Sequence, residues 1–342
     1  MESILPTTSL NNTSWPTAEL SSKAKGIVWC SAFAFEAVLI ITGNLSTIVL
    51  FLTNKRLRKK SLFLVINMAF ADLMLGAISV PFYIYFTGID YGLWKTIMPT
   101  FLLIFFLLAQ NGFLYASVIS AAFISGERFY AIYWPLKQRT LSMRAYRILI
   151  FLVWMLALLA SAIFTFGIQI FTSKISAYVL LAFFFIFITM FCGCNIAIWR
   201  KCQHRKIGDV QQQNRDLQFQ RLTKTLLIVS VVALLAWLPS VTTNCLLIVF
   251  EVSLPWGIYL ASLVLNFSNS FVNPIVYVLR IPEFKEAMVS LCCFRRLVAR
   301  DREGNRRLDD RAVALTPVAL RTDQSLSRLQ LTCAEEVMIT RL

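Results

Sequence analysis

Seven long apolar runs limit what this chain can fold into more than any other feature. They cover about residues 26–52, 61–86, 97–130, 145–171, 175–200, 222–250 and 256–279. Each run exceeds the roughly 20 residues that an α-helix needs to cross a bilayer. Because 58% of the chain is apolar and its mean hydropathy is +0.67, a soluble domain of this length is excluded. The sequence therefore predicts an all-α fold, an integral membrane seven-transmembrane helix bundle.

The charge distribution predicts how the bundle is oriented. A net charge of +15 could indicate nucleic-acid binding, but Lys and Arg concentrate in the loops 53–60, 131–147 and 200–224. Positive loops stay on the cytoplasmic side and attract the anionic lipids of the inner leaflet. The start of the chain shows no pattern of a cleavable signal, so the first run is expected to anchor it. We expect a multi-pass plasma-membrane protein with an extracellular N-terminus, membrane lipids as partners, and no nucleic acid.

The last apolar run carries polar residues where lipid disfavours them. Asn266, Asn269, Ser270 and Asn273 precede Pro274, all near the predicted inner end of this helix. A proline inside a helix removes a backbone donor and bends the helix, and nearby polar side chains can satisfy the freed carbonyls. Polar groups inside a membrane are costly and by default indicate function.

Several short motifs occur in order along the seven runs. They are Gly43-Asn44, Ala71-Asp72, Gly126-Glu127-Arg128-Phe129, Trp154, Ala236-Trp237-Leu238-Pro239 and Asn273-Pro274-Ile275-Val276-Tyr277. Together they resemble the landmarks of rhodopsin-like (class A) G-protein-coupled receptors over about residues 26–291. The resemblance implies a receptor, not an enzyme, that senses an extracellular ligand and activates a heterotrimeric G protein. Within it, the chain resembles adenosine receptors and their melanocortin, cannabinoid and sphingolipid relatives.

The resemblance also implies the organisation of the chain. Residues 1–25 would form an extracellular N-terminal segment and residues 26–280 the seven-transmembrane domain. Residues 281–294 would form a short amphipathic eighth helix, and residues 295–342 a disordered cytoplasmic tail. The disulfide common in the family has no counterpart, because Leu103 occupies the position expected for its cysteine.

A conformational switch is the next implication of the resemblance. Arg128 would pair with Glu127 in the resting state and release it in the active state, whereas a lone arginine could also simply extend toward water from a helix end. The other predicted switch residues are Trp237, Pro239, Asn273, Pro274 and Tyr277. Phe219 stands where a second acidic partner of the arginine is often found, so raised basal activity is expected.

Asp72 is a buried carboxylate at the middle of the predicted membrane. The family's sodium site is complete here, which implies sodium as an allosteric ligand and no required cofactor. The predicted sodium ligands are Asp72, Ser117, Asn269 and Asn273, with Asn44, Ser270 and Trp237 around them. An Asp72 that is neutral, or bonded to Asn273 without an ion, is the alternative. Glu36 is a second buried acid, explained equally well by a polar partner, a ligand cation or a structural hydrogen bond.

The ligand is the least constrained part of the prediction. The candidate ligand-binding residues are Gln110, Asn111, Leu114, Trp237, Asn244, Leu263 and Phe267. Gln110 replaces the Asp of amine receptors, and Phe267 replaces the Lys that holds retinal. Asn244 favours adenosine or a related purine, whereas Asn266 and Phe267 replace the Ser-His pair of adenosine receptors. A lipid or small peptide of the melanocortin or cannabinoid type stays open, and a seven-helix transporter is a remote alternative.

The two ends of the chain carry modification and docking motifs. Asn11 and Asn12 lie in glycosylation sequons. Cys292 and Cys293 follow the amphipathic segment and suit palmitoylation, although two free thiols are the alternative. Ser325, Ser327 and Thr332 are candidate phosphorylation sites for arrestin. The end, Thr340-Arg341-Leu342, fits a PDZ protein.

Overall fold

The computed structural model describes residues 16–60, 62–95, 98–170, 173–203, 232–280 and 284–289. All secondary structure in these residues is helical, which confirms the predicted fold class. The long helices are α1 (Pro16–Thr53), α2 (Leu62–Met74), α3 (Val80–Asp90), α4 (Thr100–Tyr133), α6 (Met143–Ile170), α7 (Ser173–Gln203) and α9 (Trp256–Arg280). The shorter elements are η1 (Lys55–Leu57), η2 (Leu75–Ser79), α5 (Pro135–Thr140) and the helix Val232–Ile248.

Five spans in the described residues are long and apolar enough to cross a membrane. They are Ser21–Thr53, Leu62–Asp90, Thr100–Tyr133, Met143–Gly167 and Leu181–Lys201. The helix Val232–Ile248 is apolar but shorter, since the residues just before it lie outside the described part. α9 is not among these five spans, and its Asn and Ser residues lower its hydropathy.

Two helices differ from the sequence expectation for a local physical reason. The first helix begins at Pro16 instead of near residue 26, because proline suits the first helical position and good helix formers follow it. The second span is interrupted by η2, a π-helical turn that ends just before Pro81. Proline cannot donate the backbone hydrogen bond of a regular helix, so a wider turn precedes it.

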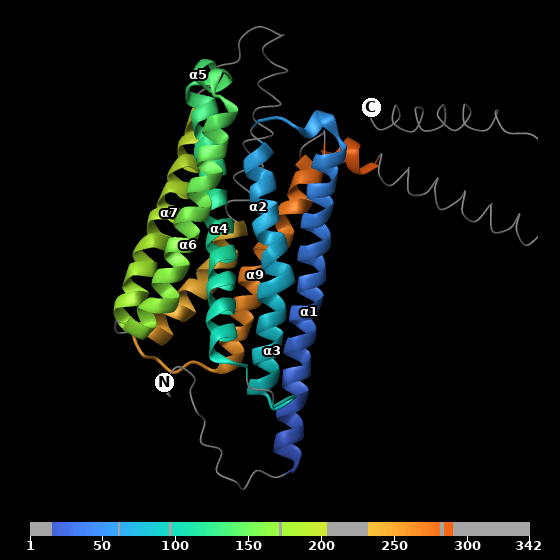
Figure 1. Cartoon of the computed structure of the whole chain (residues 1–342), viewed down its shortest axis with the longest axis vertical. Helices are drawn as coiled ribbons and strands as arrows, with labels where there is room; N and C mark the ends of the chain where they lie inside the picture. The colour runs from blue at the N-terminus through green and yellow to red at the C-terminus, as the bar shows by residue number, and fades with distance from the viewer. Residues whose placement is uncertain are drawn as a thin grey trace, which may run out of the picture. The chain divides into compact units, whose positions relative to one another are not determined.

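The helices pack around two buried clusters. α4 lies against α2, α6 and α7, while α1 lies against α2, α3 and α9 (Figure 1). One cluster joins α4, α6 and α7 to the helix Val232–Ile248 and includes Ile119, Phe187 and Trp237. The other joins α1, α3 and α9 and includes Phe33 and Phe267. These clusters hold the functional side chains described below in fixed positions.

Large apolar side chains also lie on the outside of the bundle. Phe35 on α1 is 68% exposed, Phe151 on α6 is 62% exposed, and Phe185 on α7 is 71% exposed. In water such a surface would be costly, but lipid tails solvate it without penalty. The exposed faces therefore agree with a membrane environment for these helices.

Gly43 allows α1 to approach the bend of α9. A Cβ added at Gly43 would lie 3.1 Å from Cγ of Pro274, so a larger residue would push the helices apart. Pro274 lies inside α9, as predicted, and is buried. This contact brings the two helices together beside the polar residues of α9.

Residues 284–289 are helical and belong to a second compact unit, residues 282–342. Six helical residues do not confirm the predicted eighth helix over 281–294, and the other boundaries of the organisation stay predictions. Several predicted residues lie outside the described part: Asn11, Asn12, Phe219, Cys292, Cys293, Ser325, Ser327, Thr332 and Thr340–Leu342.

Candidate functional site

Asp72 of α2 is the centre of a buried polar cluster. Its Oδ1 accepts hydrogen bonds from Ser117 Oγ on α4 at 2.6 Å and from Ser270 Oγ on α9 at 2.8 Å. Its Oδ2 accepts one from Asn273 Nδ2 at 3.2 Å. Asp72 is 0% exposed, so these three donors compensate a carboxylate that water does not reach. The cluster therefore ties three helices together through one side chain.

Asn44 extends the Asp72 cluster to α1. Its Nδ2 donates to the carbonyl oxygens of Ile40 and Ser270, each at 3.0 Å. Its Oδ1 is buried and has no hydrogen-bond partner in the described residues. Asn269 is buried on α9 but makes no hydrogen bond to Asp72 in the part of the chain that the structure describes. The structure thus brings together most of the residues predicted to surround Asp72.

The oxygen atoms of this cluster fit a small hard cation. A carboxylate, two hydroxyls and the unpaired Asn44 Oδ1 gather in one buried place. Cations of this kind bind oxygen ligands, and a lone buried carboxylate gains from a positive partner. The described residues contain no group of three or more His, Cys, Asp or Glu side chains, which a transition metal would favour.

Trp237 packs in the buried cluster that joins α4, α6 and α7 to the helix Val232–Ile248. Its ring packs beside Phe184 and Phe191 of α7, with centroid distances of 6.1 and 6.0 Å. Pro239 follows two residues later inside the same helix, and beyond it Thr243 and Ser262 join their hydroxyls at 2.9 Å. The helix is therefore held to α7 on one side of Pro239 and to α9 on the other.

Glu127 and Arg128 form an ion pair near the end of α4. Arg128 Nε lies 3.4 Å from Glu127 Oε2, and the side chain of Arg128 is 31% exposed while that of Glu127 is 4% exposed. Glu127 Oε1 accepts further hydrogen bonds from Tyr146 Oη at 3.0 Å and from Gln138 Nε2 at 3.1 Å. The acid is therefore fixed by several donors, whereas about a third of the arginine side chain is exposed.

Tyr146 and Gln138 are functional candidates that the sequence reasoning missed. Gln138 lies on α5, whose first residue is Pro135, and Tyr146 lies in the first turn of α6. Both fall in or beside a loop noted only for its positive charge. Proline at the first position of a helix is a recognisable start signal, and it could have indicated an ordered segment there.

A second set of polar contacts, centred on Asn67, joins three helices. Asn67 Nδ2 on α2 donates to Ser120 Oγ on α4 at 3.0 Å, and Trp154 Nε1 on α6 donates to Asn67 Oδ1 at 2.9 Å. Each of these buried polar groups is thereby satisfied. The hydrogen bonds of Asn67 and Trp154 thus connect α2, α4 and α6 and stabilise their packing.

The predicted ligand-binding residues divide into two groups. Gln110 Nε2 donates to Tyr83 Oη at 2.5 Å, and the Tyr83 ring lies 5.2 Å from that of Phe267. Leu114 and Leu263 pack in the same cluster as Phe267, whereas Trp237 belongs to the other cluster. Tyr83 was not predicted, since an aromatic residue in an apolar run gives no signal of its own.

Two of the side-chain amides predicted to bind the ligand donate hydrogen bonds to backbone carbonyls of their own helices. Asn111 Nδ2 donates to the Leu107 carbonyl at 2.8 Å, and Asn244 Nδ2 donates to the Ser240 carbonyl at 2.7 Å. Both bonds run to the residue four positions earlier. The oxygen of each amide is the atom left to accept a bond from another group.

Glu36 is buried on α1 without a hydrogen-bond partner in the described residues. The side chain is 4% exposed, and neither carboxylate oxygen is bonded. Of the explanations that the sequence left open, the structural hydrogen bond finds no support in the described residues. An uncompensated buried carboxyl group is costly, so we expect Glu36 to lower the stability of the bundle.

A known protein family matches most of this chain. The family described as "7 transmembrane receptor (rhodopsin family)" matches residues 43–277, which is more than half of the chain. The chain belongs to this receptor family. The match confirms the predicted recognition and the predicted class, since the family consists of receptors and not of enzymes or transporters. It also identifies a multi-pass membrane protein.

Individual proteins of known name are similar to this chain at low sequence identity. The substance-P receptor of Mus musculus is 30% identical over 169 residues, 46% of this chain and 39% of that protein. The adenosine receptor A3 of Ovis aries is 23% identical over 275 residues, 72% of this chain and 83% of that protein. The tachykinin-like peptides receptor 99D of Drosophila melanogaster is 23% identical over 294 residues. The chain thus covers about two-fifths of the length of the substance-P receptor that it matches.

Proposed function

We propose that this protein is a plasma-membrane receptor that senses an extracellular ligand and activates a heterotrimeric G protein. The Glu127–Arg128 pair carries this proposal. Its acid is buried and held by Tyr146 and Gln138, while its arginine is 31% exposed at a helix end. The pair therefore has two states, one with Arg128 bound to Glu127 and one with Arg128 released. A ligand that binds one of these states more tightly shifts the equilibrium toward it.

The predicted inner face supports the G-protein part of the proposal. Lys60 Nζ donates to the Leu141 carbonyl at 2.9 Å, so two of the basic loops meet at the end of the bundle that carries Arg128. Basic loops of a membrane protein stay in the cytoplasm, where a G protein is reached. An extracellular N-terminus follows from the same argument.

The ligand class is proposed from two competing observations. The adenosine receptor A3 is similar over most of this chain, and the Asn244 oxygen is free to accept a bond from a purine amino group. The substance-P and tachykinin-like receptors are also similar and favour a small peptide. Because the Gln110, Tyr83 and Phe267 group offers a hydrogen bond among aromatic rings, a purine suits it well, and we place adenosine-like ligands first.

Sodium is proposed as the ligand of the Asp72 cluster. Asp72 and Ser117 would hold the ion, with Asn269 and Asn273 as the further predicted ligands. The ion would supply a positive charge that offsets the buried carboxylate. It would thereby stabilise the resting arrangement of α2, α4 and α9.

The remaining partners are proposed from the sequence alone. Palmitoylation of Cys292 and Cys293 would hold the chain to membrane lipids, and arrestin and a PDZ protein would bind the tail, the latter through Thr340–Leu342. Glycosylation of Asn11 and Asn12 would follow from an extracellular N-terminus.

Two experiments test these modifications. Labelled palmitate should enter the wild type but not a Cys292→Ser, Cys293→Ser variant, and equal labelling would reject palmitoylation at these cysteines. A glycosidase should shift the receptor's gel mobility, and no shift would reject glycosylation.

The proposed function is tested by a ligand panel in cells that express the receptor. The panel contains adenosine, tachykinin-type peptides and lipids, and the measurement is dissociation of the heterotrimeric G protein. Arg128→Ala at matched surface expression is the control. We expect a response to one ligand class that the control abolishes. If the control responds as the wild type does, coupling through Arg128 is rejected.

A further inference from the structure

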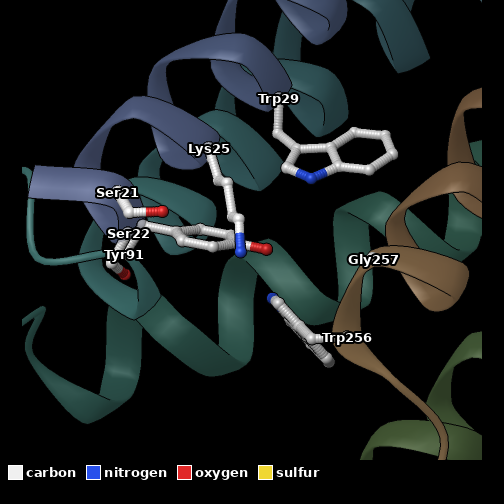
Figure 2. Close-up of a pocket in the computed structure, with 7 residues that line it drawn as sticks. All are labelled: Ser21, Ser22, Lys25, Trp29, Tyr91, Trp256 and Gly257. Carbon is white, nitrogen blue, oxygen red and sulfur yellow. The ribbon is translucent and has the colours of Figure 1, made fainter. Parts of the chain in front are cut away.

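A cavity of about 610 Å³ lies at the predicted outer end of the bundle, apart from the Asp72 cluster. It is open to the outside and bordered by the beginning of α1, the turn after α3 and the beginning of α9 (Figure 2). Its walls include Ser22, Lys25, Trp29, Tyr91, Trp256 and Gly257. None of the residues predicted to bind the receptor's ligand lines this cavity.

Two hydrogen-bond donors at the cavity, the buried Trp256 indole N–H and the exposed Lys25 ammonium, lack acceptors among the described residues. Figure 2 shows the Lys25 ammonium, the Tyr91 hydroxyl and the Trp256 indole nitrogen directed at the same space. Lys25 has no ion pair or hydrogen bond with any residue that the structure describes. Trp256 Nε1 is buried and has no hydrogen-bond partner in the described residues. A buried donor without an acceptor costs free energy, so an acceptor in the cavity would be stabilising.

The aromatic walls of the cavity are held in place by the fold. Trp256 stacks on Tyr259, with ring centroids 4.9 Å apart and an interplanar angle of 24°. Tyr91 packs tightly on α1, because a Cβ added at Gly26 would lie 2.5 Å from that of Tyr91. Gly92, at a φ of 70°, turns the chain directly after Tyr91. Fixed aromatic surfaces beside free donors make a preorganised site.

Simple anchoring at the membrane surface does not explain this arrangement. Tryptophan and lysine often mark the membrane interface, where the indole N–H and the ammonium bond to water or headgroups. Here the Trp256 N–H is buried and faces the cavity instead. Asp90, the acid next to Tyr91 in the chain, is exposed and does not line the cavity. Among the described residues, the lining therefore carries a positive charge without a negative one.

We propose that this cavity binds a small organic anion with an aromatic or apolar group. Its carboxylate, sulfonate or phosphate would accept hydrogen bonds from Lys25 and Trp256, and its ring would lie between Trp29 and Trp256. A free metabolite and the headgroup of an anionic lipid share this chemistry. The site is additional to the ligand-binding residues of the proposed receptor function.

The test uses the full-length receptor in phosphatidylcholine nanodiscs and two labelled probes of nearly equal shape. The acid 1-naphthylacetate carries the charge, and 1-naphthylacetamide does not. We expect saturable binding of the acid at least about tenfold tighter than that of the amide, because a charged hydrogen bond distinguishes the two. Saturable binding that is equal for both probes, or no saturable binding of the acid, would overturn the proposal.

Variants of the lining residues locate the binding. Lys25→Met should weaken binding of the acid about tenfold, and Trp256→Phe, which keeps a ring but removes the donor, about threefold. Lys95→Met removes an exposed lysine that does not line the cavity and should bind as the wild type does. Gly257→Leu should abolish binding, since a Cβ there meets only Trp29, at 3.8 Å, and a longer side chain would fill the cavity. Unchanged binding in Lys25→Met would overturn the proposal.

A second set of nanodiscs identifies the source of the anion. If nanodiscs that contain phosphatidylglycerol suppress binding of the acid, the site takes a lipid headgroup. If binding is the same in both kinds of nanodisc, the site takes a free anion. Both results support the cavity as an anion site. Because the measurement is direct binding and not signalling, its failure would leave the proposed receptor function untouched.

Discussion

The hydroxyl of Tyr146 donates a hydrogen bond to the Glu127 carboxylate at 3.0 Å from a side chain that is only 1% exposed. This bond connects the start of α6 with the end of α4. It holds the acid in place while Arg128 remains half-exposed beside it. The resting position of Arg128 therefore depends on α6 as well as on its neighbour in the chain.

Removing this hydroxyl should raise signalling without ligand. Tyr146→Phe keeps the ring in the core but deletes the donor to Glu127, so the acid is held less firmly and the ion pair weakens. A hydrogen bond to a charged group is worth about 1.5–3 kcal/mol, and a loss of half that changes the active fraction severalfold. Basal second-messenger output at matched surface expression measures the effect.

A matched variant separates this effect from general damage to the fold. Tyr133→Phe also removes a bonded hydroxyl near the same end of α4, but that hydroxyl donates to the Ala197 carbonyl at 3.2 Å. It should leave basal output unchanged. Equal basal outputs for Tyr146→Phe and the wild type would show that Tyr146 does not hold the switch.

Features that depend on residues close together in the chain could be predicted from the sequence. Apolar runs of membrane length predict helices wherever they occur, and Asp72 with Ser270 and Asn273 stands out because lipid disfavours such groups. The donors Tyr146, Tyr83 and Trp256 were missed. Aromatic residues are ordinary members of apolar helices, and which partner their polar atom meets depends on how neighbouring helices pack.

Phe219 provides a test of the missing second acid. Phe219→Glu would add an acid at the position where the family often carries one, so it should favour the resting state and lower basal output. An ion pair of this kind contributes about 0–1 kcal/mol when exposed, which predicts a reduction of up to about fivefold. Phe219→Gln is the control for side-chain shape without charge. Measurable basal output that is the same in all three proteins would refute this reading of Phe219.

Sodium should stabilise the protein through Asp72. A ligand that binds only the folded state raises the unfolding temperature as its concentration rises. We expect the purified receptor to unfold at a higher temperature in sodium chloride than in choline chloride at equal ionic strength. Asp72→Asn should remove the difference, because it deletes the charge that the cation would offset. A wild type indifferent to the exchange of cations would reject the sodium site.

Glu36 should lower the free energy of unfolding of the receptor. Both of its buried oxygens lack partners in the described residues, so replacing it with an apolar residue of similar length removes a desolvation cost. Glu36→Met should stabilise the receptor by about 1–3 kcal/mol, and Glu36→Gln by less because a polar group stays buried. Thermal unfolding of the ligand-free receptor measures both. A lower unfolding temperature for Glu36→Met would indicate that a partner of Glu36 contributes to the fold.

We propose that the Glu127–Arg128 pair switches a receptor that acts on heterotrimeric G proteins. Nucleotide exchange on purified G proteins, driven by the purified receptor without ligand, tests it most directly. Glu127→Gln should accelerate exchange up to about tenfold, the effect of losing ~1.4 kcal/mol of preference for the resting state. Arg128→Ala should lower exchange to the rate without receptor while its unfolding temperature stays unchanged. Exchange by folded Arg128→Ala at the wild-type rate would contradict the account.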